Sequence, residues 1–154
     1  MKPLGILVTG DPVPAARAAR GGFDTMIRDA ARGAWPGKWT AFDARGTAPL
    51  PDPESLAGVI VTGSSSSVTS REPWILAAER WLRGAVERST PVLGICFGHQ
   101  LLGSALGGSV AANPRGREIG TVRLDLVAAD PLLAGSHPPL HANTTHVDSV
   151  VTLL

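Results

Sequence analysis

The sequence predicts an α/β fold of three layers, in which helices cover both faces of a mostly parallel sheet. Three short, continuous apolar runs carry this prediction: residues 4–9, 58–62 and 91–96. Runs of this length and composition are typical of strands that are buried on both faces. Stretches with the apolar spacing of helices separate these runs, and such alternation favours a parallel sheet.

The first third of the chain supplies one further helix and one further strand. Residues 15–31 have helical spacing, and the glycine pair that begins at Gly21 should interrupt that helix. Residues 38–43 alternate loosely between apolar and polar, which predicts a second strand. Prolines at 49, 51 and 53 follow, so we expect an irregular connection within one domain.

A loop and two helices follow the strand at residues 58–62. Gly63 and four serines come directly after this strand, and ligands of open α/β sheets bind at the carboxyl ends of strands. We therefore interpret the serine run as a site loop. One helix should begin at Pro73, and a second should follow residue 96 and stop at Gly107. Residues 118–128 alternate as expected for a small antiparallel arm.

Composition and charge exclude several classes of function. The 154 residues fit one domain, 1–154, and leave no room for a second catalytic domain. A formal net charge of +1 provides no field that would attract nucleic acid or an anionic membrane. The single Cys96 cannot form an internal disulfide, and neither a leader-like segment nor a long apolar run occurs, so we expect a cytoplasmic protein. No spaced cluster of metal ligands and no phosphate-binding glycine loop occurs, so we expect neither a metal nor a cofactor.

Cys96 is the strongest candidate for a catalytic residue. It lies between Gly94 and Gly98, a pattern typical of a nucleophile elbow, in which a sharp strand-to-helix turn exposes the side chain. The following helix would direct its positive end at the sulfur and favour the thiolate. A lone cysteine is more often an ordinary buried residue, but the flanking glycines favour the elbow. The amide of Phe97 and one from the loop at Gly63 could stabilise an oxyanion.

Several short segments together resemble the class I glutamine amidotransferases, especially the stand-alone group similar to GMP synthase. They include the cysteine motif and are spread over nearly the whole chain from residue 58 onward: residues 59–64, 67–68, 73–75, 92–102, 106–108, 113–114, 116–120 and 146–150. The resemblance implies a flavodoxin-like fold and a glutaminase half-reaction. In that reaction Cys96 attacks the carboxamide of glutamine, ammonia leaves for an acceptor, and water releases glutamate from a thioester. A synthetase that accepts the ammonia is the implied partner, and a homo-oligomer is a further expectation.

The same resemblance assigns roles to individual residues. Gly63 and Phe97 take the oxyanion-hole amides, and Gln100 contacts the substrate. The substrate's α-amino and α-carboxylate groups would be held by Thr145, His146 and Val147, largely through the backbone. Glu118 matches a glutamate near the site and is expected to be structural.

One departure from the family pattern bears on activity. The catalytic histidine and glutamate of the family lie in a His-Pro-Glu motif downstream of the segment matching residues 146–150, and this sequence contains no such string. The nearest string is His137-Pro138-Pro139, which lies upstream and lacks the acid. We therefore expect the chain to be the N-terminal three quarters of a longer enzyme, inactive as given, with apolar sheet surface exposed or covered by a partner chain.

Two alternatives stay open. One is a γ-glutamyl hydrolase or peptidase, which would use the same cysteine. The other is an inactive fragment or a regulatory or binding domain. Of the four histidines, His146 is the best substitute for the missing base. The acid nearest to it along the chain is Asp148, two residues later, and no other partner for a catalytic relay is evident from the sequence.

Overall fold

The computed structural model describes residues 1–126, 128, 131–133, 135 and 139–153. His137 and Pro138, singled out above, lie outside these residues. The chain divides into two compact units, which are described separately. The first comprises Met1–Ala111 and Val150–Leu154, and the second comprises Ala112–Ser149.

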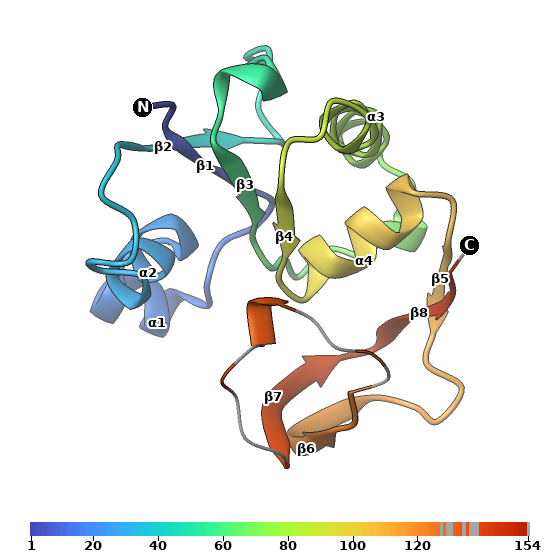
Figure 1. Ribbon diagram of the computed structural model, residues 1–154. Coiled ribbons are helices and arrows are strands. Elements are labelled where there is room, and N and C mark those ends of the chain that lie inside the picture. Colours follow the sequence, from blue (N-terminus) through green and yellow to red (C-terminus); the bar gives the residue numbers. More distant parts are fainter. Residues whose placement is uncertain (127, 129–130, 134, 136–138, 154) are drawn as a thin grey trace. The chain divides into compact units, whose positions relative to one another are not determined.

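The first unit is built on a parallel four-stranded sheet with the strand order β2-β1-β3-β4 (Figure 1). Its strands are β1 (Leu4–Val8), β2 (Trp39–Asp43), β3 (Gly58–Val61) and β4 (Val92–Gly94). Leu7 pairs with Val61, which in turn pairs with Gly94, so the carboxyl ends of three strands are level. The predicted α/β, flavodoxin-like class with a mostly parallel sheet is confirmed.

Helices cover both faces of this sheet. Figure 1 shows α3 (Pro73–Glu87) and α4 (Phe97–Ala105) together on one side, and α1 (Pro14–Arg20) and α2 (Phe23–Ala30) on the other. Two short 3₁₀ helices, η1 (Pro53–Ser55) and η2 (Val68–Ser70), lie in the connections. The predicted interruption at Gly21 is confirmed, because Gly21 has a φ of 79° and separates α1 from α2. None of the described helices is long and apolar enough to span a bilayer.

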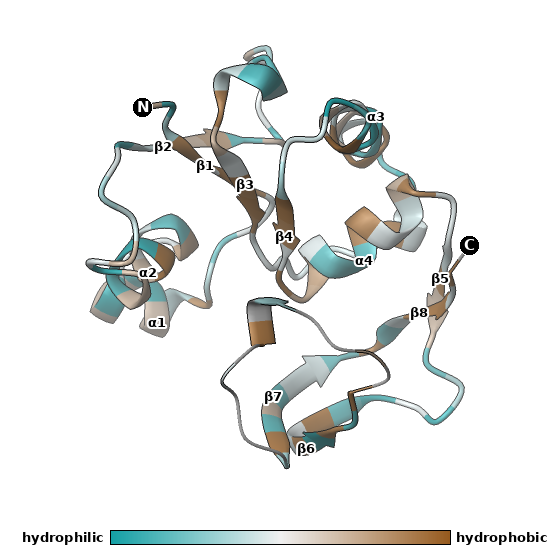
Figure 2. Ribbon diagram, in the orientation of Figure 1, coloured by the Kyte–Doolittle hydropathy of each residue, from teal (hydrophilic) through white to brown (hydrophobic). Residues whose placement is uncertain are grey.

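The core of the first unit lies between the sheet and the pair α3 and α4. Strands β1, β3 and β4 are coloured mostly brown in Figure 2, which marks hydrophobic residues. Fully burying one large apolar side chain typically contributes about 1.5–3 kcal/mol to the stability of the fold. The largest side chains with less than 2% exposure that pack there include Leu7, Val61, Ile75, Leu82, Phe97 and Leu101.

One expectation about the sheet is wrong. Within the predicted run 91–96 only residues 92–94 form a strand, and β4 is not buried on both faces, because Leu93 is 40% exposed and Ile95, directly after the strand, is 42% exposed. The reason is its position: β4 is the last strand in the order, and only β3 pairs with it in the described part of the chain. Apolar surface is therefore exposed beside this strand.

The second unit contains an antiparallel hairpin. Strands β6 (Glu118–Leu124) and β7 (Leu140–His146) pair along their full length, with Glu118 opposite His146. This confirms an antiparallel arm for the first seven residues of the segment predicted at 118–128. The short helix η3 (Pro131–Leu133) lies between the two strands in sequence.

A separate two-stranded sheet pairs β5 (Ser109–Ala112) with β8 (Asp148–Thr152).

Candidate active site

Cys96 occupies a strained turn between β4 and α4. Its backbone has φ 53° and ψ −111°, and it is the N-cap residue of α4. A residue with a side chain rarely adopts a positive φ, and such strain typically costs about 1–3 kcal/mol. Strained residues persist where the surrounding structure fixes them, and they occur most often at functional sites. The predicted elbow geometry is therefore present, and Cys96 is exposed at its tip.

The two flanking glycines are required by close packing. A Cβ atom on Gly94 would lie 2.5 Å from the carbonyl oxygen of Gly98. A Cβ atom on Gly98 would lie 2.5 Å from the carbonyl oxygen of Val61, on the neighbouring strand. Backbone cannot yield as the end of a flexible side chain can, so neither position has room for a side chain. The turn can be this tight only because both positions are glycine.

The loop after β3 lies against the cysteine. A Cβ atom on Gly63 would lie 3.7 Å from the Cβ of Cys96, which is ordinary van der Waals contact. Ile95 donates its amide to the carbonyl of Val61 at 3.0 Å, so the two strand ends stay together up to this point. The structure thus brings together Cys96, Phe97 and Gly63, as the sequence predicts.

Backbone amides near Cys96 are available to a ligand. For the N–H groups of Gly63 and Phe97, no acceptor is found in the described part of the chain, whereas His99 and Gln100 both donate to the carbonyl of Cys96. Unpaired amides at a helix N-terminus favour negative charge. The arrangement can therefore stabilise a thiolate at Cys96 and an oxyanion formed beside it.

Gln100 lies in the first turn of α4 and is only 7% exposed. The backbone N–H of Gln100 donates to the carbonyl of Cys96 at 3.1 Å, which fixes Gln100 one helical turn from the cysteine. The predicted contact between Gln100 and the substrate stays a prediction.

The remaining predicted site residues lie in the second unit. Thr145 and His146 end β7, and Val147 follows with 52% of its surface exposed. The carbonyl of Val147 accepts a hydrogen bond from the amide of Asn113 at 2.8 Å. This hydrogen bond holds the backbone at Val147, and the predicted role of the segment in holding the substrate stays a prediction.

His146 has an acidic neighbour that the sequence did not reveal. Its Nε2 lies 3.4 Å from Oε2 of Glu118, directly across the hairpin. Glu118 also accepts a hydrogen bond from Nδ2 of Asn113 at 3.0 Å, in keeping with the structural role expected for it. The Nδ1 of His146 is buried and has no hydrogen-bond partner among the described residues. The pairing register, which residue spacing alone does not give, is what places Glu118 beside His146.

A charged cluster lies at the carboxyl ends of β1 and β2. Arg45 donates to both carboxylate oxygens of Asp43, at 3.0 and 2.7 Å, and to Asp11 at 2.8 Å. These hydrogen bonds hold the pKa of Asp43 below its ordinary value and raise the pKa of Arg45. Because each charge is already paired, the cluster stabilises the loops at this edge.

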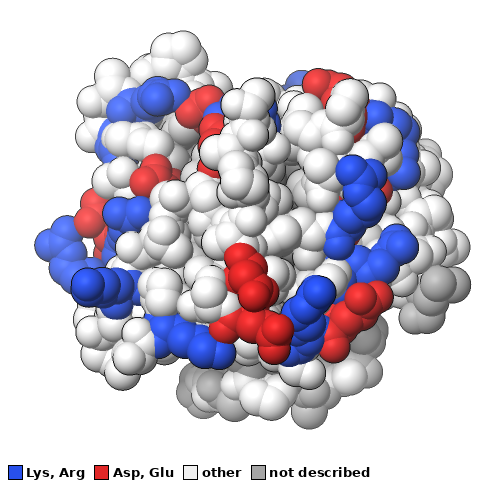
Figure 3. Space-filling view, turned by 90° about the horizontal axis from the view of Figure 1, so that it is seen from above, with Lys and Arg blue, Asp and Glu red and all other residues white. Residues whose placement is uncertain are grey.

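The described surface carries charges of both signs. On the face shown in Figure 3, Lys and Arg side chains alternate with Asp and Glu side chains. No group of three or more His, Cys, Asp or Glu residues that could hold a metal ion occurs in the described ranges.

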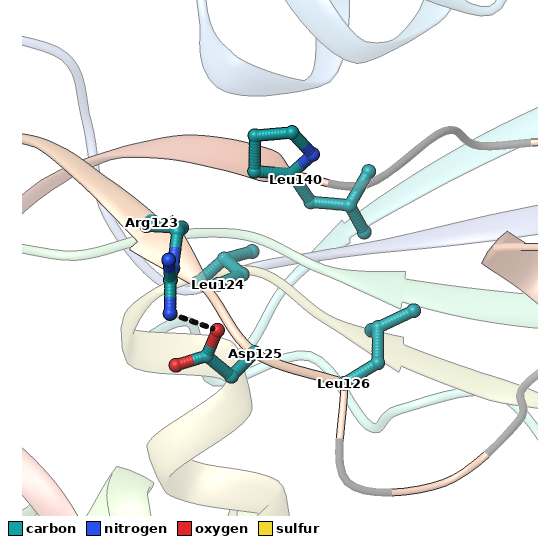
Figure 4. Close-up of a pocket in the computed structure, with 6 residues that line it drawn as sticks. Arg123, Leu124, Asp125, Leu126 and Leu140 are labelled. Atoms are coloured by element: carbon teal, nitrogen blue, oxygen red, sulfur yellow. Dashed lines mark ion pairs between the residues drawn. The ribbon is translucent and has the colours of Figure 1, made fainter.

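A hollow of about 450 Å³ lies on the hairpin of the second unit. Its charged groups, Arg123 and Asp125, form an ion pair at 2.9 Å (Figure 4). The two charges satisfy each other, so the hollow offers a ligand mainly apolar contact from its other lining residues, Leu124, Leu126, Pro139 and Leu140.

Comparison with known proteins identifies the family of the chain. The family model for glutamine amidotransferase class-I matches residues 42–153. The chain belongs to the class-I glutamine amidotransferase family. The match includes the loop at Gly63, the elbow at Cys96 and the hairpin of the second unit.

Individual relatives agree with this assignment. A Saccharomyces cerevisiae protein named "Putative glutamine amidotransferase" is 38% identical over 101 residues, which are 63% of this chain and 40% of that protein. One subunit of the glutamine-hydrolysing GMP synthase from Sulfurisphaera tokodaii is 42% identical over 66 residues, which are 42% of this chain and 34% of that protein. γ-Glutamyl peptidase 4 of Arabidopsis thaliana is 38% identical over 68 residues, 44% of this chain and 27% of that protein.

A solved structure supports the fold. The crystal structure of a glutamine amidotransferase from Thermotoga maritima superposes with a TM-score of 0.72 at 20% identity, over 97% of this chain and 62% of that chain. The present chain spans about 40% or less of the length of each of the three curated relatives named above.

Proposed function

We propose that the protein hydrolyses the side-chain amide of glutamine and that Cys96 is the nucleophile. The observation that supports this most directly is the strained backbone of Cys96, held between two obligatory glycines beside the amides of Gly63 and Phe97. Strained backbone of this kind occurs most often at functional sites. Membership of an amidotransferase family supplies the substrate class.

The proposed reaction has two halves. The thiolate of Cys96 attacks the side-chain carbonyl carbon of glutamine, and the carbonyl π electrons move to oxygen, where the amides of Gly63 and Phe97 donate to the oxyanion. The oxyanion collapses, the carbon–nitrogen bond breaks, and the leaving nitrogen takes a proton to depart as ammonia. Water then attacks the thioester and the carbon–sulfur bond breaks, which releases glutamate and restores the thiolate; one proton of the water returns to the group that protonated the ammonia, and the other goes to solvent.

We propose the remaining site residues on the family resemblance. Gln100 contacts the substrate side chain, and the backbone of Thr145, His146 and Val147 holds its α-amino and α-carboxylate groups. The ordered backbone at Val147 and the contact between Glu118 and His146 support this role of the segment. The proton that the ammonia requires would come from the histidine of a His-Pro-Glu string, which these 154 residues do not contain. On that ground we propose that they do not turn over glutamine by themselves.

The ammonia is proposed to pass to a synthetase partner. The relative from Sulfurisphaera tokodaii is named as one subunit of a GMP synthase, which supports a division of labour between an amidotransferase and a separate synthetase. The proposed location is the cytoplasm, where thiols such as that of Cys96 stay reduced.

The second candidate function is hydrolysis of γ-glutamyl peptides. The similarity to γ-glutamyl peptidase 4 favours it, because the same thioester chemistry serves both reactions. The two functions differ in the leaving group, which is ammonia in one and the amino group of a peptide in the other.

A comparison of substrates tests the proposal. The protein as its gene encodes it is incubated with glutamine or with γ-glutamyl dipeptides, and glutamate is measured with each. We expect kcat/KM to be higher with glutamine and to vanish in Cys96→Ala, whereas Cys96→Ser controls for the size of the side chain. Higher kcat/KM with the dipeptides would favour the peptidase. Unchanged turnover in Cys96→Ala would contradict both functions, and no turnover with either substrate would favour a regulatory or binding domain.

A further inference from the structure

Two buried threonines lie where β1 and β3 end. Thr9 is 0% exposed and Thr62 is 1% exposed, and both follow strands made of core residues. A hydroxyl group buried this deeply is unfavourable unless it is hydrogen-bonded. Neither side chain takes part in the reaction proposed above.

The two threonines form one hydrogen-bonded group. The amide of Thr9 donates to Oγ1 of Thr62 at 3.0 Å, and Oγ1 of Thr9 donates to the carbonyl of Thr62 at 2.8 Å. Oγ1 of Thr62 then donates to the carbonyl of Gly63 at 3.1 Å. Oγ1 of Thr9 also lies 3.1 Å from Oγ1 of Thr62 and 3.3 Å from the carbonyl of Gly63. Each hydroxyl has one hydrogen, so this assignment uses every donor once.

These hydrogen bonds fix the orientation of two successive peptides. In a planar trans peptide, the C=O and the N–H of the next residue point in opposite directions. The carbonyls of Thr62 and Gly63 are both held by the threonine hydroxyls, so the N–H groups of Gly63 and Ser64 point away from them. No acceptor for either N–H is found among the residues that the structure describes.

The same loop is also held from the side of β1. A Cβ atom on Gly10 would lie 2.6 Å from the Cα of Ser64, so Ser64 packs directly on the backbone that follows Thr9. On its other side, Gly63 lies beside Cys96, since a Cβ atom added to Gly63 would be 3.7 Å from the Cβ of Cys96. The threonine pair therefore sets the backbone of a loop that lies beside the cysteine.

We propose that Thr9 and Thr62 are positioning residues for the oxyanion hole. By binding two carbonyls, they hold the amide of Gly63, and with it the following peptide, in the orientation that Gly63 needs to donate to an oxyanion at Cys96. This inference rests on the proposed function, because it assigns the threonines to the reaction at Cys96. Preorganised donors stabilise charge that develops in the transition state, so the threonine pair acts on kcat and little on substrate binding.

The test uses the protein as its gene encodes it and removes one hydroxyl without changing the size of the side chain. In Thr62→Val, we expect kcat for glutamine to fall roughly tenfold to hundredfold, since outright loss of one oxyanion donor typically costs about a hundredfold to a thousandfold. The KM for glutamine should change less than about twofold. Thr62→Ser keeps the hydroxyl and should recover most of the rate, and Thr9→Val against Thr9→Ser provides the matched pair on β1.

A second readout separates positioning from general disruption. Iodoacetamide alkylates Cys96 without forming an oxyanion, so its rate should be the same in Thr62→Val and in the unmodified protein. Glutamate γ-semialdehyde adds to the thiolate and places a negative oxygen in the oxyanion hole, so its affinity should fall about tenfold or more in Thr62→Val. Circular dichroism and thermal unfolding show that the variant is folded.

The outcomes distinguish this inference from the function on which it rests. If glutamine is hydrolysed but Thr62→Val is folded and keeps kcat within about twofold, the threonines are structural and the inference is wrong. An equal loss in alkylation and in kcat would also contradict it, because the whole elbow would have moved. If the unmodified protein neither hydrolyses glutamine nor binds the aldehyde, the proposed function fails and the inference falls with it.

Discussion

The two compact units are stabilised in different ways. Every buried hydrophobic residue among the described residues lies in the first unit, where strands and helices pack side chains such as Leu82 and Leu101 completely. The hairpin of the second unit is held by strand pairing and by polar contacts, such as Glu118 with His146 and Thr121 with Asn143. A close-packed interior can hold a strained residue, whereas an exposed hairpin can relax. The strained turn at Cys96 belongs to the unit with the core.

The largest expected effect is loss of packing in the first unit. Leu101→Ala removes a fully buried side chain from α4, so the free energy of unfolding should fall by about 2–5 kcal/mol. Ile119→Ala is the matched control in the hairpin, where the side chain is 70% exposed, and should change stability by about 0.5 kcal/mol or less. Urea unfolding measures both. Equal losses would contradict the difference between the units.

Glycine substitutions test the same difference between the two units. Gly98→Ala would place a Cβ atom 2.5 Å from a backbone oxygen, so we expect a loss of about 1–3 kcal/mol or more together with a displaced Cys96. Gly116→Ala, in the second unit, has free space around it and only a positive φ of 85° to oppose it, so it should cost about 1 kcal/mol. Thermal unfolding and the alkylation rate of Cys96 give both results. An alkylation rate unchanged in Gly98→Ala would show that the elbow tolerates a side chain.

Replacing the cysteine measures the strain in the turn. Glycine adopts a φ of 53° freely, whereas alanine does not, so Cys96→Gly should be more stable than Cys96→Ala by about 1 kcal/mol. Denaturant unfolding of the two variants, neither of which has a thiol, provides the difference. Equal stability, or a more stable alanine variant, would mean that the turn relaxes once the cysteine is gone.

The smallest effect concerns pH. Hydrogen bonds from Arg45 lower the pKa of Asp43 in the folded protein, so the pair stabilises the fold above the unfolded pKa of about 3.9 and this contribution is lost as the pH falls through the folded pKa. Both side chains are partly exposed, at 43% and 33%, which limits the contribution to about 1 kcal/mol or less. The stability difference between the unmodified protein and Asp43→Asn should thus be present at neutral pH and vanish in acid. A difference that grows in acid would contradict this sign.

Much of the first unit could be predicted from the sequence, because buried strands and glycine-flanked turns leave local patterns. The strands at 4–9 and 58–62 and the turn at Cys96 have such patterns, and the structure contains them. The exposure of β4 could not be predicted, since an apolar run does not say which strand ends a sheet. Nor could the contact of Glu118 with His146, which depends on a pairing register across 28 residues of chain. The threonine pair was missed because Thr9 and Thr62 have no local motif, only strand ends that a parallel sheet brings together.

The central claim is that Cys96 forms a glutamyl thioester, and trapping that thioester tests it most directly. The protein as its gene encodes it is mixed with radiolabelled glutamine, quenched in acid during turnover, digested and mapped by mass spectrometry. We predict label on the peptide that contains Cys96, and none in Cys96→Ala. Turnover of glutamine with no label on that peptide, or with equal label in Cys96→Ala, would contradict the claim.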